Sequence, residues 1–451
     1  MSQPSAQPDR GSWATRIGFI LAAVGSAVGL GNMWRFSYIA SEGGGAAFVV
    51  LYLVIVATVG IPILTSEFVI GRLSQESPVL SLQRLAGPAW RPLAWLFVVC
   101  GVGILTYYAV IAGWTLRYAV DGLRGAIRGD TAAYFGSVSE GGDAVAAQLV
   151  VMALTIWIVA RGVKGGLERA NLVMMPALFV ILIGLALWAA TLPNGGPGYA
   201  YYLRPEIGEL FSGRVLAMAA GQAFFSLSLG MGTMMTYASY LRSQTNLGRE
   251  AATVALTDTA VAFTAGLVVF PVIFNFGLSD RIAESTVGAL FISLPAGFEQ
   301  MGTAGNVVAF AFFTMLAFAA LTSAISLLEV PVAALVDGWK MSRPRASVIS
   351  GIVTALIGLR AAFDVDIVGA SDQIVGNFLL ITGGFFICLL AGYRLRAQAD
   401  AELAKGLPNP AARRAWLVFV RFIAPALLLV VMYSALGPTW RALLVLLGFG
   451  G

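Results

Sequence analysis

Two short segments, far apart in the chain, carry the same arrangement of glycines inside long apolar stretches. Ala27–Asn32 reads Ala-Val-Gly-Leu-Gly-Asn, and Ser228–Thr233 reads Ser-Leu-Gly-Met-Gly-Thr. Two glycines within three residues weaken a helix, at about 1 kcal/mol each relative to alanine, and permit non-helical backbone angles. In lipid each freed amide or carbonyl costs several kcal/mol, so such a break survives where it faces a cavity or a ligand. Close helix packing would explain one cluster equally well, but two matched clusters favour a binding site.

The ends of broken helices determine which ligands such a site can hold. Half-helix amino ends present partial positive charge to an anion, and carbonyls at the carboxyl ends can coordinate a cation. A carboxylate together with sodium fits this geometry. Asp258 strengthens the hypothesis, because an acidic residue at membrane depth is costly and marks a functional site by default. A structural capping aspartate is the alternative.

Other kinds of chemistry lack the residues that they need. The chain has no histidine, no His-Glu metal motif and no phosphate-binding loop, so we expect neither an enzyme nor catalytic residues. Cys100 and Cys388 fall within predicted spans, which argues against a disulfide or a thiolate metal site. The net charge is +5, but the basic residues form no stripe or run, so no nucleic-acid partner is expected.

The composition is that of a membrane protein, since 58% of the 451 residues are hydrophobic and only 11% are charged, against roughly 25% charged in soluble domains. A helix needs about 20 apolar residues to cross the bilayer. We therefore predict an all-α polytopic membrane protein with 11 transmembrane helices. The predicted spans are 15–40, 46–71, 92–120, 146–162, 168–191, 214–240, 250–277, 305–337, 346–362, 372–394 and 412–436.

The distribution of charged residues among the loops predicts the orientation. Basic residues in short loops favour the cytoplasm, and the loops after spans two, four, six, eight and ten are all basic. The opposite loops carry many acidic and fewer basic residues. The amino terminus is therefore predicted inside and the carboxyl terminus outside, in the inner (plasma) membrane of a cell. The segment 438–451 is too short for a twelfth span.

Three separated motifs resemble the neurotransmitter:sodium symporter family, in its bacterial amino-acid transporter branch. They are Trp13–Arg16 followed by Gly25–Phe36 (GSAVGLGNMWRF), then Gly221–Gly230 (GQAFFSLSLG), then Ala319–Ser323 (AALTS). The resemblance implies two five-helix inverted repeats, with helices 1 and 6 unwound at the membrane midplane. Ser37 departs from the family pattern, which usually has proline there.

The same resemblance divides the chain into five parts. They are a cytoplasmic amino-terminal segment with inner-gate residues (1–14), the first repeat with helices 1–5 (15–191), an extracellular loop (192–213), the second repeat with helices 6–10 (214–396), and helix 11 with an extracellular tail (397–451). The oligomeric state stays open.

The resemblance implies two sodium ions as cofactors, both held by oxygen atoms. The first would be bound by Ala27, Asn32, Ser226 and Asp258 together with the substrate carboxylate. The second would be bound by backbone oxygens of Gly25, Val28 and Ala319 and by the hydroxyls of Thr322 and Ser323. Chloride-dependent relatives have a neutral amide at position 258 and a serine one turn later, where this chain has Ala262. We therefore predict no chloride requirement.

The substrate follows from the residue at position 29. Amine transporters of the family carry an aspartate nearby, whereas Gly29 leaves space for the carboxylate of an amino acid. The carboxylate would meet the Tyr108 hydroxyl and the amides near Leu30 and Gly31, and the ammonium would meet carbonyls near Ala27, Phe225 and Ser226. The remaining implied pocket is mostly apolar: Ser26, Ile104, Tyr107, Phe225, Ser228, Met231, Ala320, Ser323, Ala324 and Leu327. Because methionine is a flexible gap-filler, Met231 indicates tolerance of several large hydrophobic side chains.

Two charged pairs match the gates of the family. Arg35 and Asp372 would form the outer gate above Tyr108 and Phe225, and Arg10 and Asp337 the inner gate above Trp13. Solvated charges at helix ends are the alternative for any single one. Gly166 and Pro176 in span five predict a stretch that can unwind and let water reach the second sodium site, although a simple proline kink explains them equally well.

The predicted function is sodium-coupled import of hydrophobic or aromatic L-amino acids by alternating access. An amino-acid-sensing receptor or a channel-like protein on the same fold is the alternative.

Overall fold

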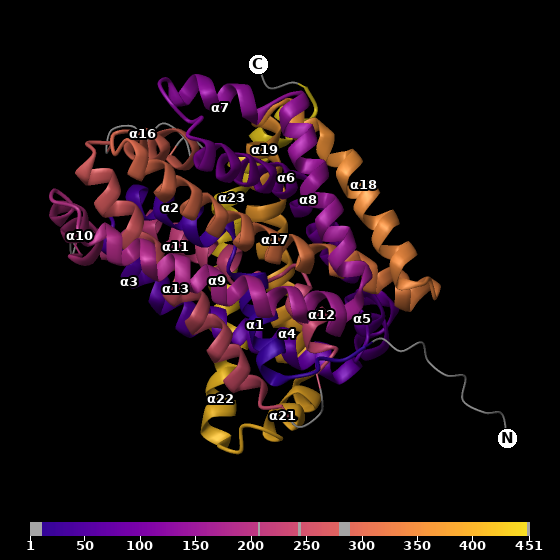
Figure 1. The fold of residues 1–451 in the computed structure, drawn as a ribbon. Coiled ribbons are helices and arrows are strands. Elements are labelled where there is room, and N and C mark those ends of the chain that lie inside the picture. Colours follow the sequence, from indigo (N-terminus) through magenta and orange to yellow (C-terminus); the bar gives the residue numbers. More distant parts are fainter. Residues whose placement is uncertain (1–10, 206–207, 242–244, 279–288, 449–451) are drawn as a thin grey trace.

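The computed structural model describes residues 11–205, 208–241, 245–278 and 289–448 of the chain. In these ranges all regular elements are helices (Figure 1). Nine helical segments among them are long and apolar enough to cross a membrane. They are α3 to α4 (Ala46–Ser74), α6 with its leading turn (Pro88–Arg124), α8 (Gly142–Ala160), α9 with its leading turn η4 (Val163–Ala189), α13 (Leu247–Asn275), α17 (Thr303–Trp339), α18 (Arg343–Phe363), α19 to η8 (Val365–Arg394) and α22 to α23 (Pro410–Leu446).

Two more predicted spans are interrupted helices. α1 (Arg16–Ala27) and the stretch Gly31–Glu42 form one apolar pair that is bent by 61°. α11 (Gly213–Ser226) and α12 (Thr233–Ala238) occupy the predicted sixth span, and each alone is shorter than a bilayer crossing. All eleven predicted spans therefore coincide with helix, and the number that crosses the membrane stays a prediction.

Two predicted helix ends were wrong. α23 (Ala424–Leu446) continues through Pro438 to Leu446 instead of ending at residue 436, because in an apolar surrounding only continued helix satisfies the backbone groups. Span ten begins at Val365 and not at Asp372, since the Asp364 side chain accepts a hydrogen bond of 2.9 Å from the Asp366 amide and caps α19 (Val365–Ser371). Asp372 instead begins a wide turn, η7 (Asp372–Leu379), inside the span.

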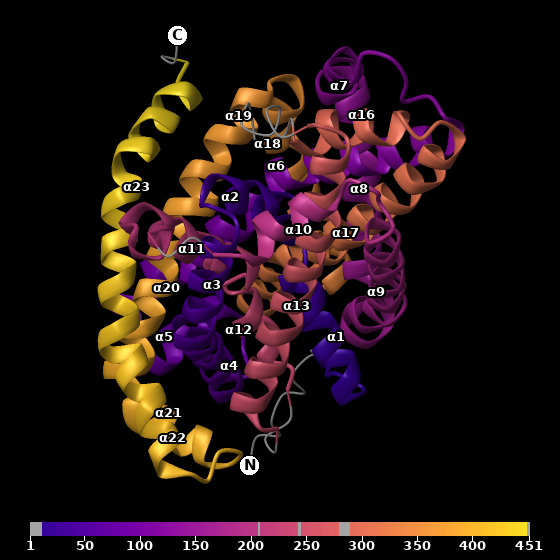
Figure 2. The ribbon, with the colours of Figure 1, turned by 90° about the vertical axis from the view of Figure 1, so that its left-hand side faces the viewer.

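The shorter helices lie in the connections. α7 (Thr131–Ser139), α16 (Leu294–Glu299) and α19 are at one end of the molecule, and α21 (Arg396–Ala404) and α22 (Pro410–Val418) are at the other (Figures 1 and 2). α10 (Gly196–Leu203) lies within the predicted outer loop and is docked on the helices. The Tyr201 hydroxyl donates to the Ser41 carbonyl at 2.7 Å, and the Tyr202 hydroxyl to the Phe263 carbonyl at 3.0 Å.

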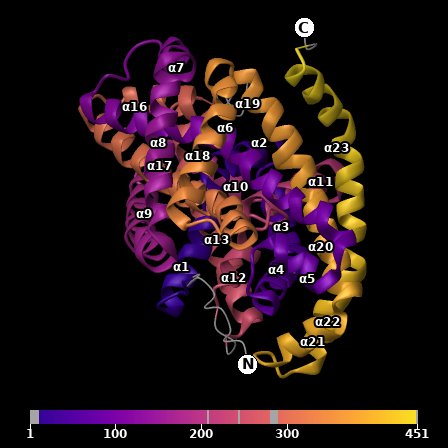
Figure 3. The same ribbon diagram turned by 90° about the vertical axis from the view of Figure 1, so that its right-hand side faces the viewer.

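The interrupted helix α1 is enclosed by other helices. It packs against α9 (Arg169–Ala189), α13 and α17, and α17 forms the most extensive helix pair of the molecule with α6 (Arg91–Arg124). α23 lies along one side, against α19 and α20 (Leu380–Leu389) (Figures 2 and 3). The break in α1 is therefore far from any lipid-facing surface.

The outer face of α9 shows what the bundle presents to its surroundings. Val173, Val180 and Leu187 are seven residues apart and are 68%, 71% and 68% exposed. Met175 and Leu178 on the opposite face are fully buried. An apolar stripe turned outward on a long helix is the pattern of contact with lipid tails.

Ser37 shows how the chain accommodates its departure from the usual proline. Its hydroxyl donates to the Met33 carbonyl, one turn earlier, at 3.1 Å. α2 (Phe36–Glu42) therefore continues directly from the preceding turn.

The predicted orientation can be tested with reporter fusions at two points. Because ten spans are predicted before Lys405 and eleven before Leu446, we expect fluorescence from green fluorescent protein fused after Lys405 and alkaline phosphatase activity after Leu446. The converse fusions should be inactive. The same reporter active at both points would contradict the topology.

Candidate functional site

The break in the first helix exposes backbone groups that other helices satisfy. α1 ends at Ala27, and Val28 is extended (φ −70°, ψ 104°) before the chain re-forms a helical turn, η1 (Gly31–Arg35). Two amides freed here have partners: the Leu30 amide donates to the Tyr108 hydroxyl (3.0 Å), and the Gly29 amide donates to Asn32 Oδ1 (3.0 Å). The Gly31 carbonyl accepts from the Phe36 amide and also from Gln222 Nε2 on α11 (2.9 Å). Side chains of α6 and α11 therefore hold the predicted break open.

The second break lies beside the first and is tied to it. Between α11 and α12, Ser228 and Gly230 adopt left-handed backbone angles (φ 53° and 81°). A Cβ on Gly230 would overlap the Leu380 carbonyl, so the position requires glycine. The Ser228 hydroxyl donates to the Ser26 carbonyl at 2.8 Å, and the Gly230 amide donates to Glu67 Oε1 at 2.7 Å. One polar side chain thus joins the two interrupted helices directly.

Asp258 on α13 lies where the two breaks meet. Its carboxylate accepts hydrogen bonds from Asn32 Nδ2 (2.7 Å) and from the Ser226 hydroxyl (2.6 Å), and the Tyr52 hydroxyl reaches Ser226 Oγ at 3.3 Å. Asp258 and Asn32 have no solvent exposure. Within the described residues, no lysine or arginine forms an ion pair with Asp258. The structure therefore brings together three of the four residues of the predicted first sodium site around a buried carboxyl group that has no basic partner in the described residues. Ala27, the fourth, is the last residue of α1.

The residues of the predicted second sodium site gather between the carboxyl end of α1 and α17. Ser323 Oγ is 3.4 Å from both the Gly25 and the Val28 carbonyl oxygens. The Thr322 hydroxyl donates within its own helix to the Ala319 carbonyl at 3.0 Å. The five predicted residues supply carbonyl and hydroxyl oxygens, which are the ligands that such broken helices offer to sodium.

A small cavity lies between the breaks, α6 and α17. It has a volume of about 20 Å³, the space of roughly one water molecule. It is lined by Ser26, Ala27, Gly29, Gly31, Ile104, Tyr108, Phe225, Ser228, Met231, Ser323 and Leu327, all of which belong to the predicted substrate site. An amino-acid side chain enters only if some of these residues move.

Five residues of the predicted substrate site do not line this cavity: Leu30, Tyr107, Ser226, Ala320 and Ala324. The Leu30 amide donates to the Tyr108 hydroxyl, which does line the cavity, and the Ser226 hydroxyl donates to Asp258. The Tyr107 hydroxyl donates to Asp372 Oδ1 at 2.9 Å, toward the predicted outer gate. Its place in the substrate pocket stays a prediction. Ala320 and Ala324 are buried in α17.

The ion pair of Arg35 and Asp372 separates the small central cavity from a larger outer cavity. Arg35 Nε lies 3.9 Å from Asp372 Oδ2, its guanidinium covers the Phe225 ring at 4.4 Å, and it also donates to Asn377. Beyond it is an outer cavity of about 750 Å³, lined by both Arg35 and Asp372. Phe225 and Arg35 therefore form a two-layered closure, as the gate hypothesis expects.

The inner side is closed by an aromatic cluster. Trp13 is buried, its indole donates to the Tyr237 carbonyl at 2.9 Å, and its ring packs edge-on against Phe19 and Tyr237. Asp337 Oδ2 accepts from the Ser77 amide at 2.6 Å. Arg10, the predicted partner of Asp337, lies outside the described residues.

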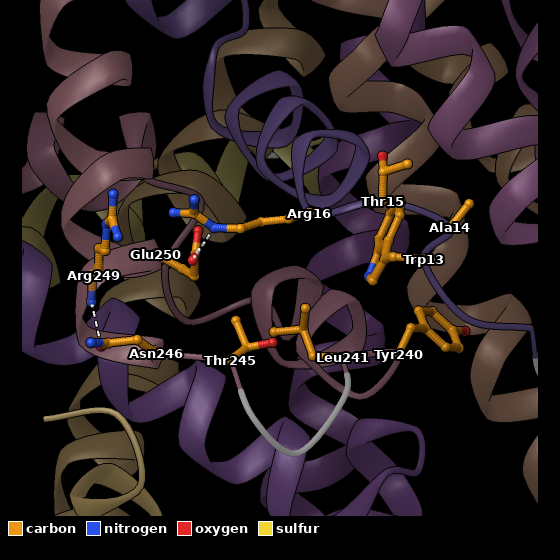
Figure 4. A pocket seen from close by; sticks show the side chains of 10 residues that line it. All are labelled: Trp13, Ala14, Thr15, Arg16, Tyr240, Leu241, Thr245, Asn246, Arg249 and Glu250. Atoms are coloured by element: carbon orange, nitrogen blue, oxygen red, sulfur yellow. Dashed lines mark hydrogen bonds and ion pairs between the residues drawn. The ribbon is translucent and has the colours of Figure 1, made fainter.

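A third cavity, of about 460 Å³, adjoins Trp13 on this side (Figure 4). Figure 4 shows Arg16 and Glu250 meeting across it, with Arg16 Nε 2.7 Å from Glu250 Oε1. This ion pair fixes the first turn of α1 to α13. Trp13 therefore lies between an aqueous-facing cavity and the centre of the protein.

Sequence reasoning missed three buried acidic residues around the site. Glu67 accepts from the second break, and Glu329 binds Arg343 through two contacts of 2.8 Å and accepts from the Tyr240 hydroxyl at 2.6 Å. The rule applied to Asp258, that an acidic residue in an apolar span is functional by default, would have selected Glu67 and Glu329 as well.

Glu168 is the third missed residue, and it links α1 to the fifth span. Its carboxylate accepts from the Ala14 amide (2.7 Å), the Thr15 amide (3.1 Å) and the Thr15 hydroxyl (2.8 Å). A carboxylate at a helix amino end is stabilised by the partial positive charge there. A Cβ on Gly18 would overlap the Glu168 side chain, so a larger residue there would displace this carboxylate.

The helical bundle and its buried oxygen-lined site between two interrupted helices define a polytopic membrane transporter. The model of the sodium:neurotransmitter symporter family matches residues 10–133 and 134–437. The chain belongs to this family, and the family predicted from the three motifs is confirmed. It is thus a sodium-dependent transporter and not an enzyme.

Relatives from distant organisms extend the similarity over the whole length. The chain is 36% identical over 444 residues to an uncharacterised sodium-dependent transporter of Bacillus subtilis, covering 94% of this chain and 97% of the relative. It is 34% identical to one of Methanocaldococcus jannaschii, covering 94% and 90%. The crystal structure of MhsT in complex with L-phenylalanine is 40% identical, with a TM-score of 0.87, covering 94% of this chain and 100% of that one.

Gly29 offers a direct test of the site. A Cβ there would lie 2.6 Å from the Tyr108 hydroxyl and 2.7 Å from Ser323 Oγ, so Gly29→Ala must displace groups of both the substrate site and the second sodium site. We expect sodium-driven transport to fall at least about tenfold, which corresponds to about 1.4 kcal/mol.

Gly221→Ala is the matched control, because a Cβ at this position of α11 would have no neighbour within 4 Å. It should transport like the unmodified protein in reconstituted vesicles. Equal activity of the two variants would show that the Gly29 break is not part of the site.

Proposed function

We propose that this transporter imports hydrophobic or aromatic L-amino acids together with two sodium ions and without chloride, by alternating access of one central site. The observation that carries the proposal is the Asp258 carboxylate. It is fully buried, it is hydrogen-bonded to Asn32 and Ser226, and no basic side chain in the described part of the chain pairs with it. A buried charge without a counter-charge is strongly unfavourable. A bound sodium ion at this point would supply the missing charge.

The absence of a chloride requirement follows from the same residue. Asp258 brings its own negative charge to the first sodium site, and Ala262, one turn later on α13, offers no hydroxyl to an anion. A carboxylate next to the cation does the electrostatic work that a chloride ion would otherwise do.

The substrate class is supported by the space around Gly29. The Tyr108 hydroxyl and Ser323 Oγ approach Gly29 so closely that an aspartate side chain has no room. An amine substrate would therefore lack its partner, whereas a carboxylate-bearing amino acid needs only the amides and the Tyr108 hydroxyl at the break. The Tyr108 hydroxyl accepts from the Leu30 amide, and a hydroxyl that accepts a hydrogen bond can also donate its proton to a carboxylate.

The side-chain preference is supported by the rest of the lining. Ile104, Phe225, Met231 and Leu327 supply an apolar wall to the cavity, and apolar walls favour apolar ligands. MhsT, which is 40% identical, has been crystallised with L-phenylalanine. The flexible Met231 gives the cavity a way to open for side chains of different shapes.

Alternating access is supported by the two closures. The Arg35–Asp372 pair lies above the site, and Trp13 packs below it. In an arrangement of two repeats, 15–191 and 214–396, the halves would rock around the fixed site. The membrane potential drives the cycle inward, at about 2.3 kcal/mol per net charge per 100 mV.

The substrate can be identified by thermal unfolding of the purified protein. A ligand at 100 times its Kd stabilises the folded state by about 2.7 kcal/mol, so leucine, phenylalanine and tryptophan should raise the unfolding temperature in sodium. Glycine and glutamate should not. Stabilisation that is equal in sodium and in choline would contradict sodium coupling.

The role of Asp258 can be tested by uptake into proteoliposomes. Uptake by the unmodified protein should be the same in chloride and in gluconate. Asp258→Asn with Ala262→Ser removes the charge and adds a hydroxyl one turn away, so sodium-driven uptake should be lost in gluconate and recovered in chloride.

The single variant Ala262→Ser serves as the control, because it retains the Asp258 carboxylate. Amino-acid uptake by this variant should stay independent of chloride. Chloride-dependent uptake by the unmodified protein would overturn the proposed role of Asp258.

A further inference from the structure

Asn171 on α9 is a buried amide whose carbonyl oxygen has no partner. The residue has no solvent exposure. Its Nδ2 donates to the Leu167 carbonyl at 2.9 Å, one turn earlier on the same helix. That bond fixes which end of the amide faces the helix, since only the nitrogen can donate to a carbonyl. Oδ1 therefore points away from α9, and it is buried without a hydrogen-bond partner.

The direction in which Oδ1 points is given by Gly25. A Cβ built on Gly25 would overlap Asn171 Oδ1 and would lie 3.1 Å from Met175 Sδ and 3.2 Å from Thr322 Cβ. Asn171 and Thr322 thus face each other across Gly25, with no side chain between them. Gly25 supplies a carbonyl, and Thr322 a hydroxyl, to the predicted second sodium site.

No neighbouring side chain in the described part of the chain donates a hydrogen bond to the Asn171 amide oxygen. Its neighbours Met175 on α9 and Leu167 in the preceding turn η4 are apolar and buried. The nearby Thr322 hydroxyl is directed to the carbonyls of Ala319 and Phe318, at 3.0 and 3.1 Å. Leaving a buried hydrogen-bond acceptor unpaired costs free energy. Such an acceptor is therefore expected where a ligand or ion binds to it.

We propose that Asn171 supplies an additional side-chain oxygen to the second sodium site, from α9. The inference rests on the proposed sodium coupling and deepens it by naming a residue outside the implied set of Gly25, Val28, Ala319, Thr322 and Ser323. An amide carbonyl is a suitable donor, because sodium in such sites is coordinated by oxygen atoms.

The position of Asn171 gives this oxygen a role in release as well as in binding. It lies between Gly166 and Pro176, the stretch of span five that the sequence predicts to unwind. It also lies one turn from Glu168, which holds the amino end of α1. Asn171 Oδ1 faces Gly25 from α9, so it would lie on the α9 side of an ion held between α1 and α17. Movement of α9 would therefore withdraw one ligand and weaken sodium binding.

The test measures sodium affinity in the absence of amino acid, because the first sodium site needs the substrate carboxylate for completion. Sodium-dependent thermal stabilisation and binding of radioactive sodium are recorded for the purified protein. Asn171→Leu removes the oxygen at nearly constant volume, and we expect its apparent sodium Kd to rise about tenfold. Asn171→Asp keeps an oxygen and adds charge, so its sodium Kd should be equal to or lower than that of the unmodified protein.

Met175→Leu is the matched control, since Met175 also contacts the Gly25 position from α9 but carries no oxygen. Its sodium Kd should stay within twofold of the unmodified value, and the unfolding temperatures in choline report whether each variant is folded. If Asn171→Leu does not fold, Asn171→Ala removes the same oxygen without added bulk.

Two results would overturn the assignment of Asn171: a sodium Kd for Asn171→Leu that matches Met175→Leu, or a loss of affinity in Asn171→Asp as large as in Asn171→Leu. Either result leaves sodium coupling intact. Failure of the unmodified protein to respond to sodium would instead contradict the proposed function itself.

Discussion

The structure depends on one constraint, which is that a backbone amide or carbonyl freed inside the membrane must find a partner. The first span is interrupted at Val28, and the sixth span at Ser228–Gly232. Both interruptions free backbone groups where water is scarce, and each group left unpaired costs several kcal/mol. The side chains that bind the breaks come from three helices, with Tyr108 on α6, Gln222 on α11 and Glu67 on α4 (Ile61–Ser74). Ser228, in the second break, adds a bond to the Ser26 carbonyl. The breaks are therefore not weak points in the fold. They are the positions on which the surrounding helices converge.

The groups that satisfy the breaks are also those that can bind a ligand, which would let one site serve ion and substrate together as proposed. Asn32 shows the principle, because its Oδ1 accepts from the Gly29 amide while its Nδ2 donates to Asp258. A cation placed beside Asp258 needs oxygen atoms where these hydrogen bonds now are. Binding of sodium would therefore exchange internal hydrogen bonds for metal ligands, and the shape of the break would change with the ion. In such a site the affinity for the amino acid cannot be independent of sodium.

How far the sequence predicts this structure differs from one feature to another, for physical reasons. Glycine pairs and apolar length are local properties, so the breaks and the eleven helical spans could be read from short windows. Helix ends were less predictable, because the cap at Asp364 and the passage of α23 through Pro438 depend on a single side chain and on the apolar surroundings. Tyr107 and Tyr108 are adjacent and chemically identical, yet one faces Asp372 and the other the Leu30 amide. Only the packing of α6 decides which of the two lines the cavity. Glu67, Glu168 and Asn171 were missed because each acts through a contact far away in the sequence.

The short inner half of the first helix is where these constraints combine into a mechanism. α1 has only 12 residues, too few to be stable alone, so its position is set by what holds its two ends. At the amino end Glu168 accepts from Ala14 and Thr15, Trp13 is bonded to Tyr237, and Arg16 is paired with Glu250. At the carboxyl end the Gly25 and Val28 carbonyls face Ser323. Moving the amino end outward would carry those carbonyls away from α17, because a helix of three turns moves as a rigid body. If the proposed second sodium site lies here, release of its ion and opening of the inner side would be the same motion. An ion bound at the carboxyl end would then stabilise the closed form by the free energy of its own binding.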